Sequence, residues 1–125
     1  MPNGNQRILA VVEDLFFTVK INESAKRAGM PIVFVKSEKD AMDQAGQKPA
    51  LIIVDLNCGA IDPLHLVRTL KANEETKGIS LIGYLSHVQG ELKQQAQEAG
   101  CDMVLARSTF SQNLPQILKR HSTVL

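Results

Sequence analysis

The chain has 125 residues, enough for one hydrophobic core and too few for two, so we expect a single domain. Its 14 basic and 13 acidic residues nearly cancel, which argues against nucleic acid or an anionic membrane as a partner. Two cysteines make no disulfide framework, and neither a signal peptide nor a membrane-spanning apolar run is found, so we expect a cytoplasmic protein.

Five short apolar runs follow a polar opening. We expect residues 1–6 to be a disordered lead-in and residues 7–122 to form the domain. The runs are ILAVV (8–12), IVFV (32–35), ALIIVDL (50–56), ISLIGYL (79–85) and MVLA (103–106). Consecutive apolar residues rich in Ile and Val are typical of strands covered on both faces, and therefore of a parallel sheet.

The segments after these runs show the spacing of helices. Their apolar residues recur at intervals of three and four, as in Phe17, Ile21, Ala25 and Ala28, in Val88, Leu92, Ala96 and Ala99, and in Leu114, Ile117, Leu118 and His121. Ser37 and Asp62 have the character of helix N-caps. Pro115 interrupts the last pattern, so we place the start of that helix between Ser111 and Leu114.

A strand followed by a helix, five times over, predicts an α/β fold. Because crossovers between parallel strands are right-handed, we expect a five-stranded doubly wound sheet of flavodoxin-like order 2-1-3-4-5, with helices on both faces. In such sheets the binding crevice lies at the carboxyl ends of the strands, here between those over 8–12 and 50–56.

Polar side chains gather at that predicted edge. They are Glu13 and Asp14, then Asp55 and Asn57, then Ser86 and His87, and lastly Arg107 and Ser108. Neighbouring carboxylates repel unless a cation joins them, and Mg²⁺ prefers oxygen ligands. An ionised Asp55 could then act as a nucleophile that forms an acyl phosphate. Ser86 and Arg107 would donate hydrogen bonds to the phosphoryl oxygens.

Each residue also has a purely structural interpretation. An Asp at a strand end commonly caps the following loop, and Glu13 with Asp14 could be an N-cap and first-turn acid. Arg107 could be a surface residue in an ordinary salt bridge. The joint placement of these residues at one edge of the sheet favours a functional site.

Several of these residues lie in motifs that follow one another in a known order. An acidic pair after VV, then VDLN, DPLHLVRTLK, LSH and EAGCDMVLA resemble the receiver domain of bacterial response regulators, over residues 7–121. The resemblance implies that Asp55 is the phosphoacceptor. It also implies that Mg²⁺ is bound by Asp14, Asp55 and the backbone carbonyl of Asn57, with Glu13 behind them. Ser86 would be the switch hydroxyl.

The chain departs from the family at several positions. The Lys-Pro pair of the family reads Arg107-Ser108 here, and a cis bond without proline would cost about 2.5–4 kcal/mol. We therefore expect this loop to take another path. Val104 stands at the position of the switch aromatic, and the bulky His87 replaces the small residue after the switch hydroxyl, where it would restrict access.

Two hypotheses follow from the resemblance. The chain is either a stand-alone phosphoacceptor that receives its phosphoryl group from a histidine kinase or phosphotransfer protein, or a receiver-fold interaction module that works without phosphorylation. In the second, Arg107 pairs permanently with Asp55. We favour the first because the acidic pair accompanies Asp55.

The other expectations concern activity and partners. Beyond Mg²⁺-dependent self-phosphorylation and dephosphorylation we expect no enzymatic activity, and a flavin or nucleotide enzyme is disfavoured because the acidic, bulky EDLFFT would repel a phosphate. We expect signalling to an unknown downstream protein through contacts alone, because the sequence shows no output domain. A weak homodimer remains an open alternative.

Overall fold

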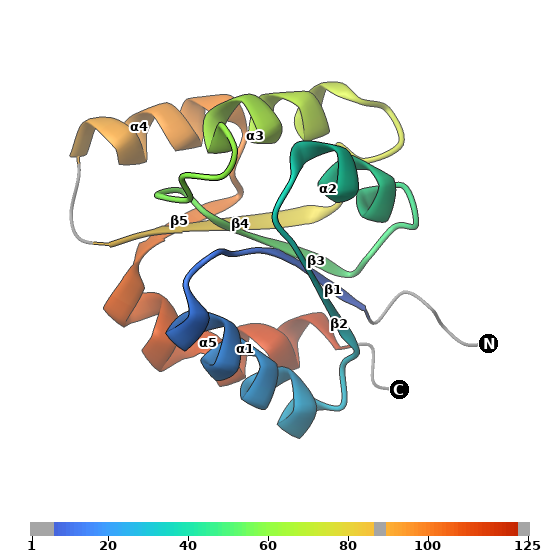
Figure 1. The fold of residues 1–125 in the computed structure, drawn as a ribbon, viewed down its shortest axis with the longest axis vertical. Helices are drawn as coiled ribbons and strands as arrows, with labels where there is room; N and C mark the ends of the chain where they lie inside the picture. Colours follow the sequence, from blue (N-terminus) through green and yellow to red (C-terminus); the bar gives the residue numbers. More distant parts are fainter. Residues whose placement is uncertain (1–6, 87–89, 123–125) are drawn as a thin grey trace.

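Five parallel strands form the centre of the molecule, in the order β2-β1-β3-β4-β5 (Figure 1). The computed structural model describes residues 7–86 and 90–122. The elements are β1 (Ile8–Val11), α1 (Leu15–Ala28), β2 (Ile32–Val35), α2 (Glu38–Ala45), β3 (Leu51–Asp55), α3 (Pro63–Ala72), β4 (Ser80–Leu85), α4 (Gly90–Ala99), β5 (Met103–Ala106) and α5 (Arg107–His121). The predicted fold class and strand order are confirmed.

Helices cover both faces of the sheet. Figure 1 shows α1 and α5 on one side and α2, α3 and α4 on the other. Every residue of β1 and β3 is buried, because these inner strands pack against helices on both faces. This double burial is the physical reason for the uninterrupted apolar runs in the sequence. The core is accordingly two layers, one on each face of the sheet.

The two predicted helix N-caps are confirmed, whereas the predicted start of α5 is not. The side chains of Ser37 and Asp62 accept hydrogen bonds from backbone N–H groups of the first turns that they cap. The predicted start of α5 between Ser111 and Leu114 is wrong, since the helix begins at Arg107 and continues through Pro115. Burial of apolar residues on both sides of the proline offsets its missing hydrogen bond; they are Phe110, Leu114, Ile117 and Leu118.

Some expectations concern residues that the structure does not describe. They are the disordered lead-in over residues 1–6, the access-restricting role of His87 and the place of Val88 in the fourth helix. Among the helices that the structure describes, none combines the length and the apolar character needed to cross a membrane.

Lys71 ties together the edge of the sheet where the strands begin. Its ammonium donates hydrogen bonds to the backbone oxygens of Lys77 and Ile79, and it forms a 3.0 Å ion pair with Asp102. The same Asp102 carboxylate oxygen accepts a hydrogen bond from the Leu81 N–H. One side chain of α3 therefore joins the turn before β4 to the residue that precedes β5.

Gly100 lies against the stem of Lys71, and we predict that Gly100→Ala destabilises the protein. The residue has a φ of +123°, and an added Cβ would stand 2.6 Å from Lys71 Cγ. Strain in this backbone region costs of order 1–3 kcal/mol, so urea denaturation should show a loss of about that size. Gly78→Ala is the control because an added Cβ there meets nothing within 4 Å. Equal midpoints for the two variants would contradict this account.

Candidate functional site

The carboxylate of Asp55 lies at the carboxyl end of the central strand β3. The residue is only 4% exposed, and its Oδ1 accepts a 2.9 Å hydrogen bond from the backbone N–H of Asn57. In the register of the sheet its partner on β4 is Tyr84. The predicted phosphoacceptor is thus held in place by the strand, by the turn that follows and by its neighbour on the next strand.

Burial sets the electrostatics of Asp55. Loss of hydration raises the pKa of this carboxyl above its ordinary value, and the charges of Asp14 and Glu13 add to the rise. The Asn57 N–H and the charge of Arg107 act in the opposite direction. Both residues of the predicted acidic pair therefore influence Asp55, as expected for groups that end neighbouring strands.

Asp14 has two structural roles. Its Oδ1 accepts hydrogen bonds from the N–H groups of Phe16 and Phe17, which makes it the N-cap of α1. Its Oδ2 lies 3.3 Å from a terminal nitrogen of Arg107. The structure thus pairs Arg107 with Asp14, whereas the interaction-module hypothesis paired it with Asp55.

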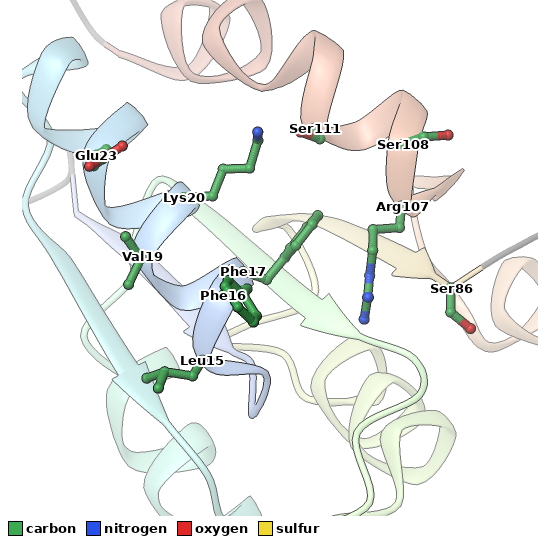
Figure 2. A pocket seen from close by; sticks show the side chains of 10 residues that line it. All are labelled: Leu15, Phe16, Phe17, Val19, Lys20, Glu23, Ser86, Arg107, Ser108 and Ser111. Atoms are coloured by element: carbon green, nitrogen blue, oxygen red, sulfur yellow. The ribbon is translucent and has the colours of Figure 1, made fainter.

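Arg107 enters the site without a loop, because β5 ends at Ala106 and α5 begins at the next residue. Its guanidinium carbon lies 5.0 Å from the centre of the Phe17 ring, within range of a cation–π contact. Figure 2 shows the side chain extending from α5 between Phe17 and Ser86. An arginine can stack on a ring and bind a carboxylate at the same time, which the compact ammonium of lysine does less well.

Glu13 and Asn57 fix the loop that follows β3. Glu13 Oε1 accepts a 3.1 Å hydrogen bond from the Gly59 N–H and lies 3.7 Å from Cys58 Sγ. Asn57 Oδ1 accepts a 2.7 Å hydrogen bond from the Ser86 N–H, which joins the β3 loop to the end of β4. These side-chain roles were not predicted, since only a backbone carbonyl of Asn57 and a supporting position for Glu13 were expected.

The predicted switch positions lie on different sides of the sheet. Ser86 is exposed just after β4, where its side chain lines the surface shown in Figure 2. Val104 is buried among the side chains packed under α2, α3 and α4, so an aliphatic core residue occupies the expected aromatic position. His87, predicted to restrict access, is outside the described residues.

An apolar surface adjoins the acidic crevice. An open cavity of about 800 Å³ lies between α1 and the start of α5, and Arg107 and Ser86 form one end of it (Figure 2). Three apolar side chains of α1 line it from the solvent side: Leu15, Phe16 and Val19, with Phe16 89% exposed. Such a contiguous exposed apolar group is typical of a protein contact surface. The periodicity of α1 identified its buried face and missed this exposed one.

The oxygen atoms at the crevice are of the kind that binds a hard cation. Carboxylate and carbonyl oxygens from the ends of β1 and β3 are the ligands that Mg²⁺ prefers. Within residues 7–86 and 90–122, however, no three acidic, histidine or cysteine side chains are already gathered as a metal site. Asp14 would have to exchange its Arg107 partner for the ion.

Comparison with known proteins supports the fold. No family model and no curated protein sequence matches the chain. A response regulator from Hahella chejuensis superposes with a TM-score of 0.82 at 20% identity, covering 94% of this chain and 96% of its own.

Two further solved structures are similar. The receiver domain of a sensor histidine kinase from Pseudomonas aeruginosa PAO1, with a magnesium ion in its active site cleft, gives a TM-score of 0.80 at 23% identity, over 94% of this chain and 97% of its own. The chemotaxis response regulator CheY4 of Vibrio cholerae gives a TM-score of 0.79 at 18% identity, covering 92% of this chain and 97% of its own. The chain therefore has the fold of response regulator receiver domains, as the motifs indicated.

Burial of Asp55 predicts how stability depends on pH. Because the pKa is raised in the folded protein, the native carboxyl holds its proton longer, and stability falls as pH rises from 3.8 through the folded value. We therefore expect Asp55→Asn to be more stable than the wild type at neutral pH, with a difference that shrinks towards pH 4. Urea midpoints between pH 4 and pH 8 measure this. Asp43→Asn, at an exposed position, is the control; a pH-independent difference for Asp55→Asn would contradict the prediction.

Proposed function

We propose that the chain is a response regulator receiver of two-component phosphorelay signalling, which accepts a phosphoryl group on Asp55. The observation that supports this most directly is the position of Asp55 at the carboxyl end of the central strand, near the two acids that follow β1 and a cation from α5. Parallel α/β sheets bind their ligands at this edge. We also propose a cytoplasmic location, in keeping with the free thiols of Cys58 and Cys101.

The proposed chemistry is a phosphoryl transfer between two side chains. A carboxylate oxygen of Asp55 attacks the phosphorus of a phosphohistidine on a histidine kinase or phosphotransfer protein. A P–O bond forms, the P–N bond breaks, and the imidazole leaves with the bonding electron pair and takes up a proton. Hydrolysis of the resulting acyl phosphate by water returns Asp55 and inorganic phosphate. Beyond this self-phosphorylation and dephosphorylation, no enzymatic reaction is proposed.

The crevice residues have distinct proposed roles in that transfer. Asp14, Asp55 and the backbone carbonyl of Asn57 would bind Mg²⁺, with Glu13 beside them, and the ion would neutralise charge on the phosphoryl oxygens. Arg107 would then leave Asp14 and donate to the phosphoryl oxygens, as its fork of N–H groups suits such an acceptor.

The apolar surface on α1 gives the proposal a place for protein contacts. Leu15, Phe16 and Val19 lie beside the crevice, and Arg107 lines both features. A phosphodonor protein bound there would have its phosphohistidine close to Asp55. We propose that the downstream protein is likewise bound through surface contacts.

A second candidate function is favoured by one observation. The ion pair between Arg107 and Asp14 already places a positive charge in the crevice. A permanent pair of this kind would keep the module in one state, and the chain would then bind its partner without phosphorylation or Mg²⁺.

One experiment separates the two functions. Mg²⁺ and beryllofluoride are added to the wild type, and binding is followed by ¹⁹F and amide NMR. In a parallel sample a small acyl phosphate donor is added with Mg²⁺, and phosphorylation is measured by intact mass spectrometry. We expect a single phosphoryl adduct and amide shifts around Asp55, and neither with Asp55→Asn. No adduct on the wild type would contradict phosphoacceptance and favour the second function. An adduct that persists in Asp55→Asn would show that the acceptor is another residue.

Arg107→Gln tests the competition between the arginine and the metal ion. Removing the cation 3.3 Å from Asp14 Oδ2 should free this oxygen, and we expect Mg²⁺ to bind about tenfold more tightly, or about 1.4 kcal/mol. Amide NMR titration with MgCl₂ measures the affinity without any phosphodonor. Arg120→Gln, at an exposed position near the end of α5, is the matched control. Equal affinities in all three proteins would mean that Arg107 does not compete with the ion.

A further inference from the structure

The hydroxyl of Tyr84 is a buried polar group to which the described part of the fold supplies no hydrogen-bond partner. The residue is completely buried on β4, and among the described residues its oxygen has no hydrogen-bond partner. Leaving a buried hydroxyl unpaired costs about 1–3 kcal/mol, so a phenylalanine would serve the core better. A ligand that accepts a hydrogen bond from this hydroxyl would explain a tyrosine at this position.

The sheet places Tyr84 directly beside Asp55. The two residues are register partners on β3 and β4. Tyr84 belongs to the core layer on the α1 and α5 side of the sheet, as does Ile53, two residues before Asp55. Since side chains alternate along a strand, Asp55 emerges on that same side.

Two other aromatic rings hold the tyrosine in this orientation. The ring of Phe17 lies 4.7 Å from that of Tyr84 and the ring of Phe110 lies 4.9 Å away, measured between centroids. Both phenylalanines are themselves buried. The phenol therefore cannot turn towards solvent to find a partner without disrupting this cluster.

Charged groups of the crevice influence the Tyr84 hydroxyl. Burial raises the pKa of Tyr84 most, and the charge of Asp55 is the next cause, followed by Arg107, which lowers it, and Asp14, which raises it. These groups come from the end of β3, the start of α5 and the N-cap of α1. The Nε of Arg107 is a second buried donor for which the described part of the chain supplies no acceptor.

We propose that the Tyr84 hydroxyl is a binding group for an oxyanion carried on Asp55, donating a hydrogen bond to one of its oxygens. This inference rests on the proposed function and adds a residue to it. The Asp55 carboxylate accepts one hydrogen bond from the described residues, at Oδ1, and none from Tyr84. A phosphoryl group extends the carboxylate by one phosphorus and three acceptor oxygens. In this proposal these oxygens accept hydrogen bonds from the two buried donors that have no partner among the described residues, the Tyr84 hydroxyl and the Nε of Arg107.

Such a donor suits the composition of this site. A neutral phenol adds no charge to a crevice that already holds Arg107, and Tyr84 is completely buried, so water is excluded from it. Hydrogen bonds to a charged acceptor in a dry environment are stronger than those between neutral groups. Tyr84 would therefore lengthen the lifetime of the acyl phosphate. It would also raise the affinity of the site for beryllofluoride, which mimics the phosphoryl group.

The direct test is Tyr84→Phe, which removes only the hydroxyl. We expect beryllofluoride, in the presence of Mg²⁺, to bind about tenfold more weakly by ¹⁹F NMR titration, since one hydrogen bond to a charged acceptor is lost. We expect the urea midpoint of the variant without ligand to be unchanged or higher, because an unpaired buried group has been removed.

Thr76→Val is the matched control. It also deletes a buried hydroxyl, but this one donates a 2.6 Å hydrogen bond to the Leu70 carbonyl at the opposite edge of the sheet. We expect the reverse result, a lower urea midpoint with unchanged beryllofluoride affinity.

A spectroscopic signal reports on the hydroxyl itself. The chain has one tyrosine and no tryptophan, so its near-ultraviolet absorbance and fluorescence above the phenylalanine range come from Tyr84 alone. We expect beryllofluoride to shift this signal in the wild type and not in Asp55→Asn.

The outcomes separate the inference from the proposed function. Equal beryllofluoride affinity in wild type and Tyr84→Phe, or an adduct that leaves the tyrosine signal unchanged, would overturn the role of Tyr84 while phosphoacceptance stands. A wild type that forms no adduct would overturn phosphoacceptance and, with it, the role of Tyr84.

Discussion

A carboxylate held almost out of water at the end of the central strand is the constraint around which the rest of the site is arranged. Asp55 loses hydration by its position on β3, between two strands and under two layers of helices. The fold supplies only partial compensation, through one backbone N–H and the nearby charge of Arg107, while Glu13 and Asp14 oppose it. A carboxylate in that condition is stabilised by any additional cation or hydrogen-bond donor, which is the physical basis for the binding role that we propose for the crevice.

Arg107 links the charged crevice to the aromatic core under α5. Its guanidinium pairs with Asp14 and stacks on Phe17, so the cation that Asp55 senses is held by groups on α1. Phe17 in turn packs against Tyr84 and Phe110, which connects the charged crevice to the core under α5. A change of partner by Arg107 would therefore be felt both in the crevice and in the packing of α1 against α5.

The sequence predicted the fold closely because its strongest signals are those of burial. Apolar runs placed β1, β3 and β4 within one residue at each end, and the strand order followed from right-handed crossovers. The start of α5 was wrong because a proline rule was applied without knowledge of the apolar residues that pack around Pro115. In the crevice, the positions of Asp14 and Asp55 followed from the ends of their strands. The ion pair between Arg107 and Asp14 and the role that we propose for Tyr84 were not predicted, since ion pairing depends on a rotamer and a tyrosine within an apolar strand resembles ordinary core.

The ties made by Lys71 give the molecule two unequal edges. At the edge where the strands begin, one ammonium joins α3, the turn before β4 and the entry to β5 through hydrogen bonds and an ion pair. At the opposite edge Arg107 pairs with Asp14, and its charge also acts on Asp55. The sheet is thus held by Lys71 at the end where the strands begin, while a change of partner by Arg107 would act at the other end. Rearrangement at the crevice can spread sideways between the ends of β3, β4 and β5 while their origins stay in register.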